Sequence, residues 1–205
     1  MTPTEARARA ILAEQHAIIT DSHVVYTSGR HGRAYVNKDA VYPDTAKVAE
    51  LCRLLAGAVA GRPVDVVCGP ATGGIILAQW TAHHLGALAV YAEKDPAGGM
   101  VLKRGYDRLV AGRRVLVVED VVNTGGSLRD TVTAVRAAGG DVVVAAALCN
   151  RGDVAAEAVG VPVLVALVHL TLESWTAEEC PLCRARVPVN TDVGKGREFL
   201  ARAAG

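Results

Sequence analysis

Two adjacent carboxylates stand directly before a run of small and hydroxyl residues near the middle of the chain. Segment Val115–Ser127 has the sequence VLVVEDVVNTGGS, in which a valine-rich run ends at Glu119 and Asp120. The turn that follows, Asn123–Ser127, contains two glycines and two hydroxyl side chains and leads into a helical pattern. Such a turn presents backbone N–H groups at a helix N-terminus, and its glycines let a phosphate approach closely.

The two carboxylates need a separate explanation, because they would repel a phosphate. They fit the site if they hydrogen-bond sugar hydroxyls or hold a divalent cation through water. A phosphate, a vicinal diol and a metal in one short motif describe a ribose 5-phosphate. The alternative is an ordinary helix cap, with Thr124 or Ser127 as the N-cap residue after an acidic strand end. Capping alone does not call for two acids and two glycines, so we favour the ribose phosphate.

Alternating strand and helix patterns would position this turn. Five short, valine-rich runs are typical of strands buried on both faces: Val64–Cys68, Ala87–Tyr91, Val115–Glu119, Val142–Leu148 and Val163–Val168. Amphipathic patterns between them predict helices over Thr45–Ala60, Gly74–Leu85 and Gly126–Ala138. This order predicts an α/β fold with an open, mostly parallel twisted sheet flanked by helices. In such sheets, ligands bind at the carboxyl ends of the strands.

A second small-residue turn, Gly69–Gly74 (GPATGG), follows the first core strand and enters a helix. It suits an anion in the same way. Tight strand-to-helix turns often have this composition for structural reasons alone. Two such turns in one sheet nevertheless favour a ligand with phosphate at both ends.

The rest of the chain divides around this core. We expect an N-terminal helix and hood segment over residues 1–43, the α/β core over 44–170 and an irregular C-terminal tail over 171–205. Within the core, Glu93–Arg108 is rich in turn formers and basic residues, which predicts a mobile loop or hairpin.

Bulk composition excludes several classes of protein. The 205 residues are 51% hydrophobic, and 22 Lys and Arg against 21 Asp and Glu give no case for binding nucleic acid. Apolar runs such as Val142–Cys149 are too short to cross a bilayer. The N-terminus lacks the apolar core of a signal peptide, and five cysteines argue against a disulfide framework. We therefore expect a soluble, cytoplasmic protein with no membrane partner, in which Cys52, Cys68 and Cys149 are buried thiols.

The pair Cys180-x-x-Cys183 raises the question of zinc. A structural zinc site needs four ligands, and no second cysteine pair has suitable spacing. His169 or a second subunit could complete such a site. A structural turn is the plainer interpretation.

The motif at 115–127 closely resembles the signature of type I phosphoribosyltransferases, which bind 5-phosphoribosyl 1-diphosphate (PRPP). Further segments are similar to the shorter bacterial orotate phosphoribosyltransferases: Thr27–Tyr35 (TSGRHGRAY), Cys68–Ala78 (CGPATGGIILA), Ala147–Gly152 (ALCNRG) and Glu179–Val189 (ECPLCRARVPV). The likeness covers roughly residues 20–190. It implies transfer of the phosphoribosyl group from PRPP to orotate, giving orotidine 5'-phosphate and pyrophosphate. It also implies a homodimer with shared active sites and Mg²⁺ as cofactor, held mainly by PRPP and water near Glu119 and Asp120 without direct protein ligands.

The resemblance assigns the PRPP contacts residue by residue. The ribose hydroxyls would meet Glu119 and Asp120, and the 5-phosphate would lie in the turn formed by Val121, Val122, Asn123, Thr124, Gly125, Gly126 and Ser127. The pyrophosphate would bind the turn at Ala71, Thr72 and Gly73. In the family, a mobile loop carries basic residues over the pyrophosphate, usually from the neighbouring subunit. The candidates here are Lys94, which would also bind PRPP, and Lys103 and Arg104, all three taken as catalytic.

The resemblance places the base near Asn123, Arg151 and His31. An arginine fork suits the carboxylate and carbonyl edge of orotate, although Arg151 could instead be a surface residue paired with Asp153. Asn123 stands where orotate enzymes commonly have threonine. This departure keeps a purine phosphoribosyltransferase with the same PRPP site open as the alternative. A PRPP-sensing regulator and a redox protein using the Cys180–Cys183 pair are less favoured.

Overall fold

The computed structural model describes residues 1–26, 28–170 and 172–203, so Thr27 of the motif at 27–35 lies outside the described residues. The chain forms two compact units. The first contains Met1–Ile11 and Tyr42–Leu170, and the second contains Leu12–Val41 and Thr171–Gly205. We expected separate hood and tail segments, but the structure groups most of the N-terminal segment with the C-terminal one, because strands from both pair with each other.

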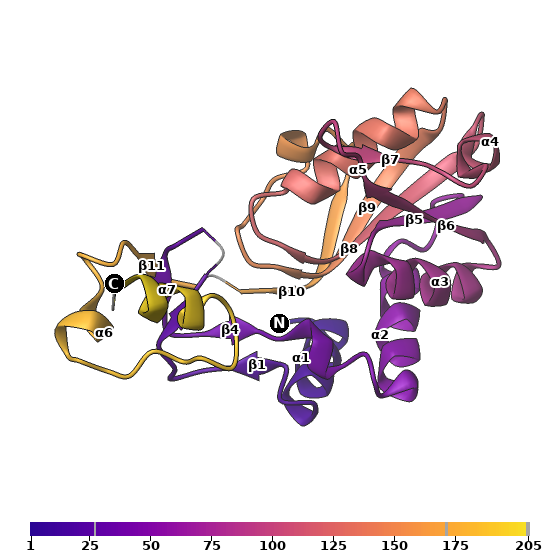
Figure 1. Ribbon diagram of the computed structural model, residues 1–205. Helices are drawn as coiled ribbons and strands as arrows, with labels where there is room; N and C mark the ends of the chain where they lie inside the picture. The colour runs from indigo at the N-terminus through magenta and orange to yellow at the C-terminus, as the bar shows by residue number, and fades with distance from the viewer. Residues whose placement is uncertain (27, 171, 204–205) are drawn as a thin grey trace. The chain divides into compact units, whose positions relative to one another are not determined.

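A six-stranded sheet forms the centre of the first unit, in the order β10-β9-β8-β5-β6-β7 (Figure 1). All neighbouring pairs are parallel except the short edge pair β6–β7. The strands are β5 (Val66–Pro70), β6 (Leu88–Lys94), β7 (Met100–Val101), β8 (Arg114–Val122), β9 (Asp141–Asn150) and β10 (Leu164–His169). The five predicted strands are all present, and most extend a few residues beyond the predicted ends. The predicted open parallel sheet is confirmed.

Helices cover both faces of this sheet. They are α2 (Thr45–Ala58), α3 (Gly73–Leu85) and α5 (Gly126–Ala137), with the shorter α4 (Tyr106–Val110) and a 3₁₀ turn, η2 (Glu157–Val159). In Figure 1, α5 lies on one face, and α2 and α3 lie on the other. Leu128, Val132 and Val135 of α5 pack with Val115 and Val117 of β8 in one buried cluster. The intervening Leu116 and Val118 are also fully buried, so β8 buries both of its faces, as its continuous apolar sequence predicts.

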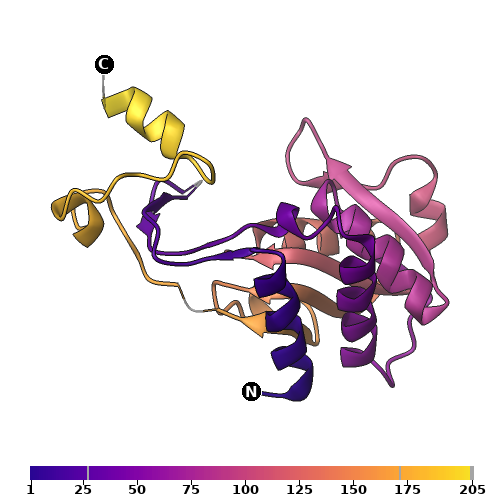
Figure 2. The ribbon, with the colours of Figure 1, turned by 90° about the horizontal axis from the view of Figure 1, so that it is seen from below.

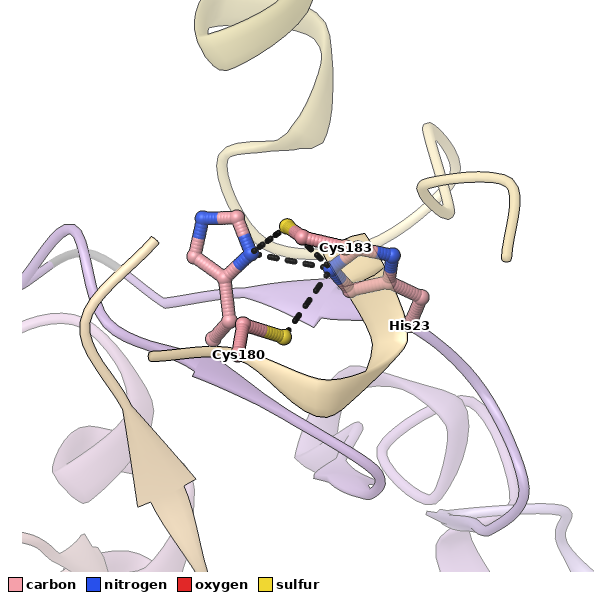
Figure 3. A group of neighbouring side chains, drawn as sticks. His23, Cys180 and Cys183 are labelled. Carbon is pink, nitrogen blue, oxygen red and sulfur yellow. Dashed lines mark hydrogen bonds between the residues drawn. The ribbon is translucent and has the colours of Figure 1, made fainter. Parts of the chain in front are cut away.

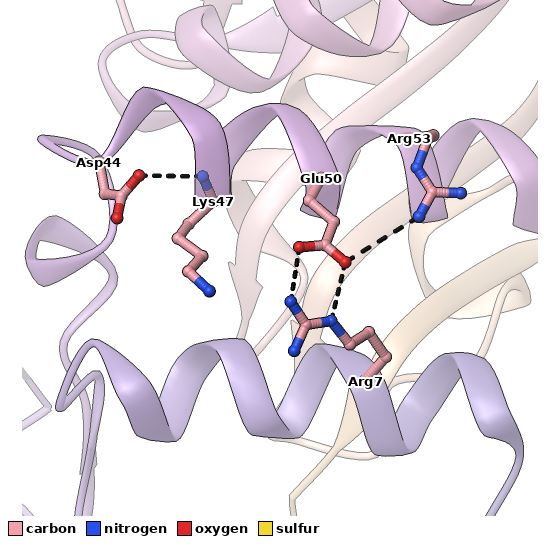
Figure 4. A network of polar contacts seen from close by, with 5 residues as sticks. All are labelled: Arg7, Asp44, Lys47, Glu50 and Arg53. Atoms are coloured by element: carbon pink, nitrogen blue, oxygen red, sulfur yellow. Dashed lines mark hydrogen bonds and ion pairs between the residues drawn. The ribbon is translucent and has the colours of Figure 1, made fainter.

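The start of α1 (Pro3–Glu14) belongs to the first unit and lies beside α2 (Figure 2). Figure 4 shows the contact between the two helices. Arg7 Nε and Nη2 each donate a hydrogen bond of 2.7 Å to one carboxylate oxygen of Glu50. The arginine lowers the pKa of Glu50. At its own N-terminus α2 is capped by Asp44, whose side chain accepts a hydrogen bond from Lys47 N.

The polar interval 93–108 contains a hairpin, one of the two forms expected. Glu93 and Lys94 at the end of β6 pair with Val101 and Met100 of β7. The turn between them closes with a hydrogen bond from Asp95 N to Gly99 O. Lys94 therefore projects from the last residue of a strand in the main sheet.

The second unit is built from very short strands. Its strands are β1 (Ile18–Ile19), β2 (Val24–Val25), β3 (His31–Gly32), β4 (Tyr35–Val36) and β11 (Ser174–Trp175), with η1 (Lys38–Ala40), α6 (Pro181–Arg184) and α7 (Gly196–Ala203). They form a two-stranded sheet, β1-β4, and a three-stranded sheet, β11-β3-β2. The expectation of an irregular tail was incomplete, because α6 and α7 are regular helices. An ion pair between Lys195 and Glu198, 2.7 Å long, supports the first turn of α7.

Cys52, Cys68 and Cys149 are buried thiols, as expected. Burial raises the pKa of Cys52 and Cys68 to about 12 and that of Cys149 to about 11. Among the described residues, no helix is long and apolar enough to cross a membrane.

Candidate active site

The two small-residue turns follow neighbouring parallel strands of the sheet. Strands β5 and β8 pair directly, with Val66 opposite Val115 and Cys68 opposite Val117. Because the strands run in the same direction, their carboxyl ends and the turns after them lie at one edge of the sheet. The structure therefore brings together the two turns that the sequence marked as anion sites.

Glu119 and Asp120 lie near the end of β8 and are each 7% exposed. Glu119 Oε1 accepts a hydrogen bond from Asp120 N at 3.1 Å, and Asp120 Oδ1 accepts one from Val121 N at 2.6 Å. Glu119 also lines a surface cavity together with the turn that follows it. Backbone N–H groups thus orient both carboxylates, and Glu119 lies at the edge of a cavity.

This cavity has a volume of about 170 Å³ and suits an anion. Its lining consists of Glu119, Val121, Val122, Asn123, Thr124, Gly125, Gly126, Ser127 and Leu128. Gly125 is the N-cap residue of α5 and has a φ of 75°, which favours glycine. No side chain among the described residues caps this helix. The alternative in which Thr124 or Ser127 caps α5 is therefore not observed, and the N-terminus of the helix faces the cavity.

The turn after β9 packs tightly against the turn after β8. Val122 O accepts hydrogen bonds from Arg151 N at 2.8 Å and Gly152 N at 3.2 Å. A Cβ atom on Gly152 would overlap the backbone carbonyl of Asn123. Sequence reasoning missed Gly152, since a single glycine in ALCNRGD carries no signal of this contact.

The turn after β5 is equally close-packed. A Cβ on Gly69 would overlap the backbone of Gly74, and one on Gly74 would lie 2.6 Å from Pro70 Cδ. The Ala71–Thr72 peptide is cis. This turn borders a second, open cavity of about 530 Å³, whose lining comprises Ala71, Lys94, Asp95, Gly98, Gly99, Met100, Gly126, Ser127 and Asp130. One cavity therefore joins both turns and the end of β6.

Comparison with known proteins identifies this arrangement. Residues 38–165 match the phosphoribosyl transferase domain family. The chain belongs to this family. The match covers the acid pair, both turns and the hairpin, as the sequence motifs predicted.

Within this family, the chain is similar to several orotate phosphoribosyltransferases. The orotate phosphoribosyltransferase of Pelotomaculum thermopropionicum is 40% identical over 181 residues, which are 87% of this chain and 92% of the relative. That of Caldanaerobacter subterraneus subsp. tengcongensis is 38% identical over 178 residues, covering 86% and 90% of the two chains. The crystal structure of Mycobacterium tuberculosis orotate phosphoribosyltransferase in complex with PRPP superimposes with a TM-score of 0.64 at 28% identity, covering 82% of this chain and 97% of that one.

The three basic candidates of the phosphoribosyltransferase loop differ in their surroundings. Lys94 lines the second cavity with Ala71 and Ser127. Lys103 is exposed. Arg104 binds Glu93 at 3.0 Å, which raises the pKa of Arg104, and its guanidinium lies 5.8 Å from the centre of the Tyr91 ring. Of the three, Lys94 is the one that the structure places beside both turns.

The residues expected at the base lie in different surroundings. Asn123 is exposed and lines the first cavity, and Arg151 follows β9 with its backbone held by Val122. His31 has no exposed surface, and its Nδ1 lies 2.9 Å from His23 Nε2. Burial, and then the neighbouring His23, lower the pKa of His31. This burial speaks against the base contact expected of His31, because a ligand can only contact a side chain that it can reach.

Tyr42 is a residue that sequence reasoning missed. Its hydroxyl lies 3.1 Å from Gly73 O and 3.3 Å from Asp120 Oδ2. It thus connects the turn after β5 to the acid pair after β8. The short segment before α2 that carries Tyr42 has no motif, so only the folded structure shows this role.

We expect Tyr42→Phe to raise the KM for PRPP about three- to tenfold with a smaller change in kcat, because a positioning hydrogen bond contributes about 0.5–1.5 kcal/mol. Steady-state kinetics with varied PRPP would measure this. Tyr106→Phe is the matched control, since the Tyr106 ring packs on Tyr91 and against the buried core cluster. Equal KM values for Tyr42→Phe and the wild type would remove Tyr42 from the site.

Proposed function

We propose that this protein transfers the 5-phosphoribosyl group from PRPP to orotate, yielding orotidine 5'-phosphate and pyrophosphate. The observation that carries the proposal is the identity of 36–40% with orotate phosphoribosyltransferases over most of the chain. The two turns at one sheet edge, with an acid pair at the end of β8, supply the chemistry that this reaction needs.

Each group of residues has one task in this proposal. The turn Val121–Ser127 holds the 5-phosphate through its backbone N–H groups and the start of α5. Glu119 and Asp120 accept hydrogen bonds from the ribose hydroxyls. Ala71–Gly73 and Lys94 hold the pyrophosphate, because Ala71 and Lys94 line the cavity that Ser127 also lines.

In the reaction, the bond between C1 of the ribose and pyrophosphate oxygen breaks, and a bond from C1 to a ring nitrogen of the base forms. The pyrophosphate leaves with the electron pair of the broken bond, and the nitrogen loses its proton. The transition state resembles a ribosyl cation, as in other glycosyl transfers. No covalent nucleophile is needed. Catalysis comes from positioning and from neutralising the leaving group.

The donor set at the site fits a hydrated Mg²⁺, the cofactor that the family generally uses. Mg²⁺ prefers oxygen ligands and keeps several waters, binding through few carboxylates together with substrate phosphates. Glu119 and Asp120 would hold it through water beside the first cavity, and when bound it neutralises charge on the departing pyrophosphate. A homodimer with shared active sites and a cytoplasmic location complete the proposal, both on the family resemblance.

Lys94 is the residue we expect to stabilise the leaving pyrophosphate from within the same chain. Lys94→Ala should lower kcat at least tenfold with a modest change in PRPP affinity, since the charge matters most when the bond to pyrophosphate breaks. Single-turnover rates measure the effect. Lys103→Ala, made in parallel, tests the second lysine: an equal loss would show that both act, and an unchanged rate would remove Lys103 from the mechanism.

A substrate panel tests the proposed function directly. Purified protein with PRPP and Mg²⁺ is supplied in turn with orotate, adenine, hypoxanthine, xanthine and uracil, and pyrophosphate release is measured with and without Mg²⁺. We expect turnover with orotate and with none of the other four bases, and we expect this turnover to be lost when Mg²⁺ is removed. Turnover with a purine instead would establish the alternative, a purine phosphoribosyltransferase. PRPP binding without turnover on any base would favour a regulator.

A further inference from the structure

Four metal-binding side chains converge in the second unit, remote in sequence from one another. His23 precedes β2 and His31 lies in β3, while Cys180 and Cys183 lie at the start of α6 and within it. Their ligand atoms all lie within 4.8 Å of one another. Three of these residues are buried, and Cys183 is partly buried. We propose that they bind a structural Zn²⁺ with Cys₂His₂ ligation.

Four of the six distances between the ligand atoms are close to those of a tetrahedral site. His23 Nε2 lies 2.9 Å from His31 Nδ1, 3.7 Å from Cys180 Sγ and 3.6 Å from Cys183 Sγ. Cys183 Sγ lies 3.4 Å from His31 Nδ1. With Zn–N bonds of about 2.0–2.1 Å and Zn–S bonds of about 2.3 Å, the edges of a regular tetrahedron are about 3.3–3.8 Å long. Of these four pairs, only the histidine pair must separate, by a few tenths of an ångström, and the remaining two pairs lie within 4.8 Å.

The other ring nitrogen of His23 fixes the orientation that a zinc ligand requires. His23 Nδ1 lies 2.8 Å from Val187 O. Because a carbonyl oxygen only accepts, Nδ1 carries the proton and donates it, which leaves the Nε2 lone pair facing the two sulfurs (Figure 3). A backbone carbonyl that holds the outer N–H is the usual support of a metal-bound histidine.

Hydrogen bonds among the four side chains explain their convergence less well than a bound metal ion does. The single lone pair of His23 Nε2 faces three neighbours, His31 and the two thiols, and can satisfy one donor fully. Thiols are weak hydrogen-bond donors, so gathering two thiols and two imidazoles in a buried cluster gains little from hydrogen bonds alone. One cation of charge +2, bound by two thiolates and two neutral imidazoles, satisfies all four ligand atoms together.

The site would join the two ends of the second unit. Strands β2, β3 and β11 have two residues each, so their pairing alone gives the C-terminal segment little support. A metal that links His23 and His31 to Cys180 and Cys183 closes a long chain loop, and metal binding contributes directly to the folding of such small units. This assignment gives His31 a structural role in place of the expected contact with the base.

The partners of the cysteine pair could not be found by spacing. His169, the histidine suggested from the sequence, lies in β10 of the first unit and is exposed. The two histidines that do meet the cysteines are about 150 residues away along the chain. The pairing of β3 with both β2 and β11, together with the bridge between His23 and Val189, brings them together.

The first experiment measures metal in the full-length protein. The chain is expressed without a histidine tag, purified under reducing conditions without chelator, and analysed by inductively coupled plasma mass spectrometry. We expect about one zinc per chain. The cobalt-substituted protein should show the intense visible d–d bands of tetrahedral Co²⁺ and a thiolate-to-cobalt charge-transfer band. Wild-type protein that takes up no zinc or cobalt under these conditions would overturn the proposal, as would an octahedral cobalt spectrum.

Variants test the ligand set. Cys183→Ser and His31→Ala should each lower zinc content at least tenfold after dialysis against a weak chelator, and should lower the Tm. His169→Ala and Cys52→Ala are matched controls that should keep about one zinc per chain. Retention of zinc in both ligand variants, or its equal loss from the controls, would refute the assignment. If the ligand variants do not fold, the metal content and cobalt spectrum of the wild type still decide the question, and neither depends on enzymatic activity.

Discussion

Glu119→Gln and Asp120→Asn should each lower kcat/KM for PRPP by about 10²-fold, the cost of losing a charged acceptor worth about 3 kcal/mol. Both substitutions keep the shape of the side chain and remove its charge. The carboxylates are nearly buried and are oriented by backbone N–H groups, so their position should survive the change. The loss should therefore fall on binding of the ribose hydroxyls and hydrated Mg²⁺, and titration calorimetry with PRPP and Mg²⁺ should show it as weaker association.

Asp141→Asn is the matched control for the acid pair. Asp141 is exposed and begins β9, at the opposite end of the sheet from the two turns. Its substitution removes the same charge, and Asp141 lines neither cavity. Suppose that the control has wild-type kinetics and that kcat/KM for PRPP falls tenfold or less in both acid variants. The two acids would then have a structural role at the end of β8 and would not contact the ribose.

The sequence was sufficient to predict most of the first unit, because the relevant information is local. Continuous valine-rich runs such as Val115–Val118 can only be buried on both faces, and the glycine-rich turns mark where the strands end. The parallel order places those turns on one edge. The acid pair and both turns were therefore found from the residues, and the comparisons confirmed the family that they indicated.

The contacts that escaped prediction are those between residues far apart in sequence. Tyr42 reaches Gly73 and Asp120, and Gly152 touches Asn123, but none of these pairs has a pattern that spacing reveals. For His31, the sequence instead suggested a contact that the folded structure does not favour. Its place in a family-like motif suggested the base, whereas burial beside His23 is visible only after folding.

Gly152→Ala should reduce kcat/KM for PRPP at least 10²-fold, although Gly152 itself is expected to contact no substrate. Its Cβ would overlap the Asn123 carbonyl, which is backbone and cannot turn aside like a side chain. The turn Val121–Ser127, where we propose that the 5-phosphate binds, must therefore shift, and a displacement of about 1 Å can cost about 10²-fold in rate. Overpacking of this kind should also lower the free energy of unfolding by about 1–3 kcal/mol.

Gly57→Ala separates the steric effect from the general effect of adding a methyl group. Gly57 is exposed in α2, and a Cβ there meets nothing within 4 Å. We expect unchanged kinetics and a gain in stability of up to about 1 kcal/mol, since alanine favours the helix. Thermal unfolding, PRPP affinity and kinetics measured on both variants give a clear contrast. If Gly152→Ala kept wild-type PRPP affinity and Tm, the turn after β9 would not be what positions the turn Val121–Ser127.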